Sequence, residues 1–296
     1  MKNRRVWVDI VGPVVGVAAI GMVAFSLVYL LSIRPFYRGG SYDIGRTAVS
    51  GPGWVRAEGS ETFSGEFDRL EVKNVSGPVQ IEGWSESSIQ VGYVKEARSE
   101  SALEEFEIRM QPRGRTLEIL PIYGPTPRAL FGGVSFEIRI PASLTEIKVN
   151  NVSGRIVLEN LPGDIDQELE SVSGSIETER AGDLRAKSLS GSIDFVSTGG
   201  RIDINTTSGR IQGQILGLDR GGSVDVDSIS GSVELEAFDA LDAAVTLQSV
   251  SGSIACDFPL QITEQRRNRL EGTIGGGSVP VSVKTVSGRI RLQRMD

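Results

Sequence analysis

Histidine is absent from this 296-residue sequence, and cysteine occurs once, as Cys256. Without histidine, the chain lacks the usual general base near neutral pH and the commonest transition-metal ligand. A single cysteine forms no intrachain disulfide and builds no thiolate metal site alone. The recurring serines have no histidine or suitably placed lysine to activate them as nucleophiles. We therefore expect no catalytic residues, no metal site and no cofactor.

Acidic residues outnumber basic ones by 37 to 26 after residue 40, in a chain whose formal net charge is −7. An acidic domain of this kind is a poor candidate for binding nucleic acid. Its aspartates could in principle act in pairs on polysaccharide. They stand at different distances from the repeat glycines described below, so a solvated acidic face is the better interpretation. These aspartates are Asp164, Asp166, Asp183, Asp194, Asp203, Asp225 and Asp227.

Residues 10–33 contain no charged side chain. As a helix, this segment would be roughly 36 Å long, enough to cross a hydrocarbon core about 30 Å thick. More Lys and Arg precede it than follow it, which favours a cytoplasmic N-terminus. We predict a cytoplasmic tail over 1–9, a transmembrane helix over 10–33, and the bulk of the chain periplasmic or extracellular, anchored in a bacterial inner membrane. A cleaved signal peptide is the alternative, although the apolar run is long for one.

Small and aromatic residues near this segment suggest contacts with other proteins. Gly12 and Gly16, with Ala18 and Gly21 nearby, would let a second membrane helix approach closely, although such residues are common in membrane helices generally. Residues 34–60 are rich in Gly, Pro and Arg without periodicity, and we interpret them as a linker or arm. The aromatic residues that could dock on a partner are Trp7, Tyr29, Phe36, Tyr37, Tyr42 and Trp54.

A Ser-Gly dipeptide recurs in one apolar context, for example in NVSGRIVL, SVSGSIET and TVSGRIRL. When each glycine is counted as position zero, position +2 is always Val or Ile. Positions −7, −5, −2 and +4 are mostly apolar. The repeat glycines, which we assign a structural role at a corner, are Gly77, Gly154, Gly174, Gly191, Gly209, Gly231, Gly252 and Gly288.

Alternation at period two predicts strands on both sides of each glycine. The three-residue step from −5 to −2 predicts a corner where apolar side chains stay inside and glycine supplies backbone freedom. A repeat of about 20 residues buries its apolar face only by stacking on its neighbours. We therefore predict an all-β fold with a right-handed, single-stranded β-solenoid of Val-Ser-Gly repeats over 146–296. A β-sandwich is the competing fold.

Residues 61–145 hold one repeat copy and otherwise lose the period, so we predict an N-terminal β cap there. Ser101 and Glu104 resemble a capping box, which predicts a short helix over 101–107. Strands are expected over 116–122 and 134–140. No capping element follows the last repeat, and the insertion over 257–279 could fold back to cover that end of the solenoid.

The repeats, written (V/I/L)x(V/I/L)xx(V/L/I)SG(S/R)(I/V), resemble a bacterial putative-adhesin family of cell-envelope proteins built from β-strand repeats. The closing stretch GTIGGGSVPVSVKTVSGRIRL is especially similar to that family. The resemblance covers about residues 65–292 and implies the fold. It carries over no catalytic motif, and its functional name is itself an inference from fold.

Two main functional hypotheses follow. The first is a non-catalytic, membrane-anchored binding or scaffold protein that offers a rigid extracytoplasmic surface to envelope proteins or glycans. The second is an accessory subunit that stabilises an integral-membrane complex, for example an energy-converting one, through its helix and solenoid. An enzyme acting on envelope polysaccharide is a third and weaker hypothesis.

Overall fold

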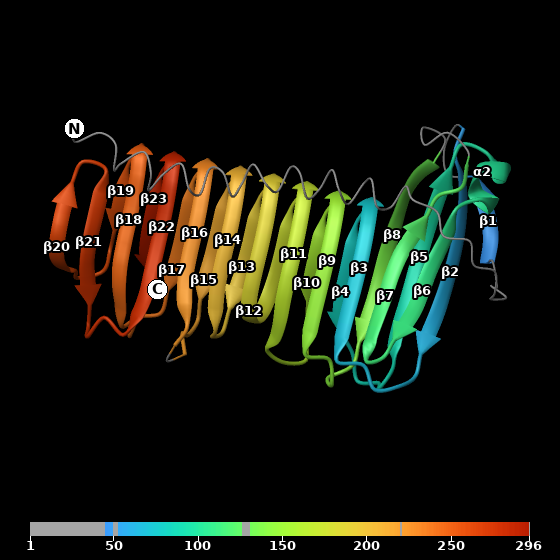
Figure 1. The fold of residues 1–296 in the computed structure, drawn as a ribbon, viewed down its shortest axis with the longest axis horizontal. Coiled ribbons are helices and arrows are strands. Elements are labelled where there is room, and N and C mark those ends of the chain that lie inside the picture. The colour runs from blue at the N-terminus through green and yellow to red at the C-terminus, as the bar shows by residue number, and fades with distance from the viewer. Residues whose placement is uncertain (1–44, 50–52, 126–130, 220, 296) are drawn as a thin grey trace. The chain divides into compact units, whose positions relative to one another are not determined.

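A computed structural model describes residues 45–49, 53–125, 131–219 and 221–295, with side chains for all but 45–49. Strands dominate these residues, as the alternation predicted, and they are accompanied by one short helix (Figure 1). Within these ranges, no helix is long and apolar enough to cross a membrane. The predicted tail and membrane helix lie outside the described residues, as do Trp7, Gly12, Gly16, Ala18, Gly21, Tyr29, Phe36, Tyr37 and Tyr42.

The described residues form two compact units, and the chain passes from the first to the second between Gly163 and Asp164. Strand structure begins at Gly45, inside the range 34–60 that we interpreted as a linker or arm. The elements of the first unit are β1 (Gly45–Val49), β2 (Val55–Phe63), β3 (Arg69–Ser76), β4 (Val79–Gly83), β5 (Ile89–Ala97), α2 (Glu100–Glu104), β6 (Glu107–Arg113), β7 (Thr116–Ile122), β8 (Phe131–Ile140), β9 (Glu146–Ser153) and β10 (Ile156–Glu159).

The strands of the first unit form two walls around an aliphatic core. One wall, here called the groove wall, has the order β1-β2-β5-β8-β4-β10, with antiparallel pairing up to β8 and parallel pairing beyond it. The other has the order β6-β7-β3-β9. Leu70, Ile81 and Ile138 lie between the walls, each at most 1% exposed. Burial of such side chains is the main stabilising contribution to the unit.

The local predictions for the first unit had mixed outcomes. The strand expected over 116–122 is β7, and the one expected over 134–140 is the second part of β8. The short helix is present, but its start was predicted wrongly. Ser99, and not Ser101, is the N-cap, because its Oγ accepts a hydrogen bond from the Ala102 N–H at 3.2 Å.

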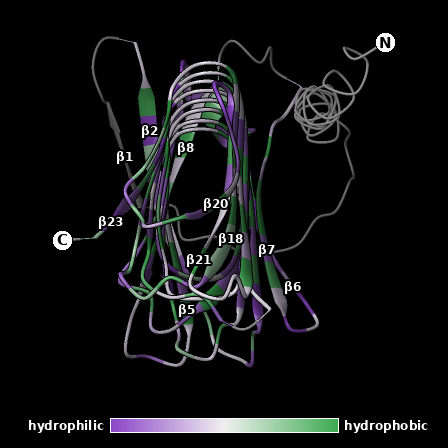
Figure 2. Ribbon diagram, turned by 90° about the vertical axis from the view of Figure 1, so that its left-hand side faces the viewer, coloured by the Kyte–Doolittle hydropathy of each residue, from purple (hydrophilic) through white to green (hydrophobic). Residues whose placement is uncertain are grey.

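The second unit is built from stacked coils, each with one strand before a Ser-Gly corner and one strand after it. The chain arches over at these corners (Figure 2). Its strands are β11 (Ile165–Ser173), β12 (Ile176–Ser190), β13 (Ile193–Ser197), β14 (Arg201–Ser208), β15 (Ile211–Ile215), β16 (Ser223–Ser230), β17 (Val233–Ala237), β18 (Ala243–Ser251), β19 (Ile254–Cys256), β20 (Gln261–Arg266), β21 (Arg269–Ile274), β22 (Val279–Ser287) and β23 (Ile290–Arg294).

The coils of this unit do not all follow the sequence order. The strands before the corners pair in the order β11-β12-β14-β16-β22-β18, all parallel. The last repeat, β22 and β23, therefore lies between the coil of β16 and β17 and the coil of β18 and β19. The insertion over 257–279 contributes the β20–β21 hairpin, which continues the sheet antiparallel to β18. It thus covers the free edge of β18.

The predicted step from −5 to −2 at the corner is wrong. Alternation continues inward through −7, −5 and −3, and the chain turns only at the Ser-Gly pair. The buried residues at −3 are polar in every copy, namely Asn74, Asn151, Ser171, Ser188, Thr206, Ser228, Ser249 and Thr285. The aliphatic residues at −2 mostly face partly outward, with Val250 45% exposed. In some copies the −3 side chain bonds a backbone carbonyl of the corner, as Ser249 Oγ does with the Gly288 carbonyl. In others, such as Ser171 and Ser228, the buried hydroxyl has no hydrogen-bond partner among the described residues.

Candidate functional site

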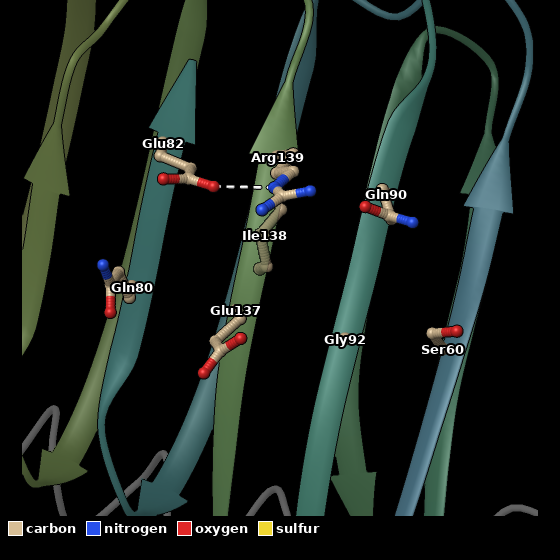
Figure 3. A pocket seen from close by; sticks show the side chains of 8 residues that line it. All are labelled: Ser60, Gln80, Glu82, Gln90, Gly92, Glu137, Ile138 and Arg139. Carbon is tan, nitrogen blue, oxygen red and sulfur yellow. Dashed lines mark hydrogen bonds and ion pairs between the residues drawn. The ribbon is translucent and has the colours of Figure 1, made fainter. Parts of the chain in front are cut away.

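A groove of about 440 Å³ opens on the outward face of the groove wall (Figure 3). This volume is within the range of small-molecule and cofactor sites. Strands β2, β5, β8 and β4 supply its lining residues, which are Ser60, Gln80, Glu82, Gln90, Gly92, Glu137, Ile138 and Arg139. Because successive side chains on a strand alternate between faces, the polar ones point outward while the Ile138 side chain is buried in the core.

The strand register arranges these side chains in two rows across the wall. In the first row, Gly92 of β5 stands between Ser60 of β2 and Glu137 of β8. Gln80 of β4 extends this row beyond Glu137. The second row is two residues along each strand.

That second row places Arg139 of β8 between Gln90 of β5 and Glu82 of β4. The sequence separates these residues by as many as 57 positions. Only strand pairing therefore brings the two rows together.

Two polar contacts hold one side of the groove. Arg139 Nε donates to Glu82 Oε1 at 2.6 Å, and Gln80 Nε2 donates to Glu159 Oε1 at 2.6 Å. Within the described part of the chain, Gln90 and Glu137 have no such partner, so their amide and carboxylate are available to a ligand. The guanidinium of Arg139 lies 6.0 Å from the ring centre of the half-exposed Trp84.

The groove wall is held from behind by a buried lysine. Lys95 on β5 is 8% exposed, and its Nζ donates to the carbonyls of Leu103 and Phe106 at the end of α2. Burial lowers the pKa of Lys95, with an opposing effect from Glu107. These contacts tie α2 to the inner face of β5. The groove therefore rests on a fixed support.

The interface and corner residues predicted from the sequence lie elsewhere. Trp54 packs within its own unit, where the Arg98 guanidinium lies 4.0 Å from its ring centre. The repeat glycines line the corners, and seven of them have positive φ angles. The sequence did not reveal the groove, because its lining residues do not occupy a common position relative to the repeat glycines. The one local signal is Gly92, a glycine inside a strand that otherwise alternates.

The aspartates singled out in the sequence do not all meet at one site, although Asp203, Asp225 and Asp227 lie near one another on the neighbouring strands β14 and β16. Asp166 Oδ1 accepts the Asp183 N–H at 3.0 Å, and Asp183 Oδ1 accepts the Arg201 N–H at 2.7 Å. Asp164 Oδ1 accepts the Thr198 hydroxyl at 2.6 Å. These carboxylates therefore stabilise successive turns. In the portion of the chain covered by the structure, no group of three or more acidic or cysteine side chains is placed to hold a metal ion.

Comparison with known proteins identifies a family. The family model described as Toastrack DUF4097 matches residues 60–293. No curated protein matches the sequence significantly. A putative adhesin from Bacteroides fragilis is 12% identical, with 79% of this chain and 96% of that chain covered and a TM-score of 0.40.

Two further solved structures are similar. A putative adhesin from Parabacteroides merdae is 12% identical over 81% of this chain and 96% of that chain, with a TM-score of 0.37. A putative lipid binding protein from Parabacteroides distasonis is 11% identical over 81% of this chain and 97% of that chain, with a TM-score of 0.29.

Proposed function

This chain belongs to the Toastrack DUF4097 family, and we propose that it is a non-catalytic binding protein of the bacterial cell envelope whose ligand site is the polar groove. The observation that carries this proposal is the groove itself, a hollow of about 440 Å³ on a braced β wall with uncommitted polar side chains. The absence of histidine from the sequence supports a binding role over acid–base catalysis.

A membrane anchor over residues 10–33 is part of this proposal. It would present both units on the extracytoplasmic side, where envelope polymers and proteins are found. The supporting observations are the charge-free length of the segment and the excess of Lys and Arg before it. In a Cys256→Ser background, Ser85→Cys places the single cysteine at an exposed position, where it should react with a membrane-impermeant maleimide on intact spheroplasts. Labelling only after lysis would contradict this orientation.

The binding role is tested with the full chain purified in mild detergent and immobilised. Solubilised cell-envelope material should be retained by the wild type and lost from a variant with Glu137→Arg, which reverses one groove charge. The same material should yield no soluble breakdown product. Equal retention by both proteins would overturn the groove as the ligand site, and groove-dependent product release would overturn the non-catalytic role.

The accessory-subunit hypothesis has its own support in the small residues Gly12, Gly16, Ala18 and Gly21. If it holds, purification in mild detergent followed by mass spectrometry will recover stoichiometric integral-membrane partners. Gly16→Leu should then release those partners while leaving groove binding intact. Extraction of the chain alone would count against this alternative.

A further inference from the structure

We infer that the polar groove binds a chain of neutral sugar residues. This inference rests on the proposed function, because it assumes that the groove is the ligand site and specifies the ligand. The argument combines an unexplained glycine, a balanced set of hydrogen-bonding groups and the lack of apolar lining.

Gly92 is the first observation. Glycine weakens a strand, and inside one it often marks a place where a ligand or another backbone approaches closely. A Cβ added at Gly92 would meet nothing nearer than the Glu137 carbonyl oxygen at 3.4 Å, which is an ordinary contact. Its φ angle is not among the positive ones. Neither crowding nor backbone conformation therefore requires glycine here.

Gly59 on the neighbouring strand β2 provides the contrast. A Cβ added there would come within 2.4 Å of the Tyr93 hydroxyl oxygen, so packing of the Tyr93 side chain explains this glycine. Gly92 has no such explanation. Its effect is to leave a hollow between Ser60 and Glu137, which face each other across it in the register. The hollow itself is the feature that a ligand would use.

The polar groups around the hollow suit hydroxyl ligands. The Glu137 carboxylate only accepts hydrogen bonds, the remaining N–H groups of Arg139 only donate them, and Gln90 and Ser60 do both. A sugar hydroxyl also donates and accepts, so it can pair with each of these groups. Unpaired groups left facing a ligand would weaken binding, and a polyhydroxyl ligand avoids this.

The charges disfavour ionic ligands. Arg139 is already paired with Glu82 at 2.6 Å, which leaves Glu137 as the uncompensated charge in the groove. A polyanion would be repelled by Glu137, and a single carboxylate is a weak basis for recognising a polycation. The groove exposes no apolar side chain, since Ile138 is 1% exposed, and so offers nothing to an acyl chain. It is partly open to solvent, so a ligand larger than the hollow is not shut out.

The test measures binding of the full chain, in mild detergent, to neutral hexasaccharides of glucose, mannose and N-acetylglucosamine, with dextran sulfate as the anionic probe. At least one neutral hexasaccharide should bind, and dextran sulfate should not. Gly92→Val fills the hollow and should weaken sugar binding at least tenfold. It should leave the melting temperature unchanged or higher, because valine favours a strand.

Two further variants complete the design. Gln90→Ala removes one amide and should weaken binding about 2- to 13-fold, the equivalent of one hydrogen bond. Gln212→Val, at an exposed position on β15 in the other unit, is the matched control and should bind like the wild type.

Failure of the sugar inference is distinguishable from failure of the proposed function. If no neutral hexasaccharide binds while envelope material is still retained through the groove, the sugar inference is overturned and the binding role stands. If Gly92→Val also leaves retention of envelope material unchanged, both are overturned. Sugar binding that Gly92→Val does not weaken would place the sugar elsewhere and overturn the inference as well.

Discussion

The backbone of the repeat glycine Gly209 lies directly against the coils on both sides of it. Gly209 has a φ angle of 138°, and its N–H donates to the Ser230 carbonyl of the neighbouring coil at 3.1 Å. A Cβ at Gly209 would lie 2.0 Å from the Gly191 carbonyl oxygen. Positive φ is unfavourable for residues with a Cβ, and a backbone atom at that distance cannot move aside cheaply. Glycine is therefore required here for two independent reasons.

Gly209→Ala should lower the free energy of unfolding by at least about 2 kcal/mol, because it combines backbone strain with a clash against a fixed carbonyl. Chemical denaturation followed by circular dichroism measures the change. Gly221→Ala is the matched control, since Gly221 has a φ angle of 97° but open space around its Cβ position. Equal losses in the two variants would show that strain alone, without the stacking contact, explains the glycine.

Asp227 should make stability depend on pH. Burial raises the pKa of this carboxyl to about 6, a rise that Lys284 opposes and Asp225 and Asp203 assist. Between about 3.9, the pKa in an unfolded chain, and 6, the folded protein binds more protons than the unfolded one. Protonation of the Asp227 carboxyl therefore adds to the free energy of unfolding at low pH. This contribution is lost as the pH rises through about 6.

Urea unfolding at pH 7.5 and 5.5 measures this dependence. Asp227→Asn should stabilise the protein at pH 7.5 by about 1 kcal/mol, after allowance for partial solvent screening, and should flatten the difference between the two pH values. Asp239→Asn, at an exposed carboxylate, should keep the wild-type difference. An unchanged pH response in Asp227→Asn would refute the assignment.

The strand–corner–strand element repeats its geometry but not its hydrogen bonds. At position −3, Asn74 is fully buried, and its Nδ2 donates to the carbonyls of Gly77 at 3.1 Å and Val134 at 3.0 Å. Its Oδ1 accepts the Val75 N–H at 2.8 Å. Ser188, at the same position, has no hydrogen-bond partner for its Oγ among the described residues. The residue at position −3 therefore contributes differently to the free energy of unfolding in different copies of the repeat.

Substitutions at this position should have opposite consequences. Asn74→Ala removes the side-chain donor to the Val134 carbonyl and the side-chain acceptor of the Val75 N–H, while Asn151 Nδ2 still donates to the Gly77 carbonyl at 3.0 Å. It should reduce the free energy of unfolding by about 2–4 kcal/mol. Ser188→Ala removes an unpaired hydroxyl and should change it by no more than about 0.5 kcal/mol, or stabilise the protein slightly. Denaturant titration of both variants decides the matter, and a similar large loss in each would contradict this account.

At the scale of the whole molecule, the end of the sequence lies within the second unit. Strand β22 pairs with β16 on one side and β18 on the other, and β23 lies between β17 and β19. The Val283 side chain on β22 is fully buried. The last repeat therefore joins two coils that precede it in the sequence.

Ending the chain after Ser278 should disrupt the second unit, because it removes a coil from between two others. We expect loss of its cooperative thermal transition and rapid proteolysis after residue 164. Ending the chain after Arg294 is the control, since it removes one described hydrogen bond, from the Met295 N–H to the Ala237 carbonyl. A wild-type transition in the shorter chain would mean that β18 can pair directly with β16.

The sequence by itself determined the strands, the corners and the family of the fold. These follow from local rules, because side chains alternate along a strand and glycine recurs where the backbone turns. The register of eight glycines was therefore readable without coordinates.

The inward direction of the −3 residues, the insertion of β22 between β16 and β18, and the groove were decided only by the tertiary structure. The carbonyls that Asn74 contacts, the free edge of β18 and the partners of Gly92 all depend on which strands become neighbours. Strand neighbours far apart in the sequence are chosen by packing of the whole unit, and no local pattern around Gly92 or β22 specifies them.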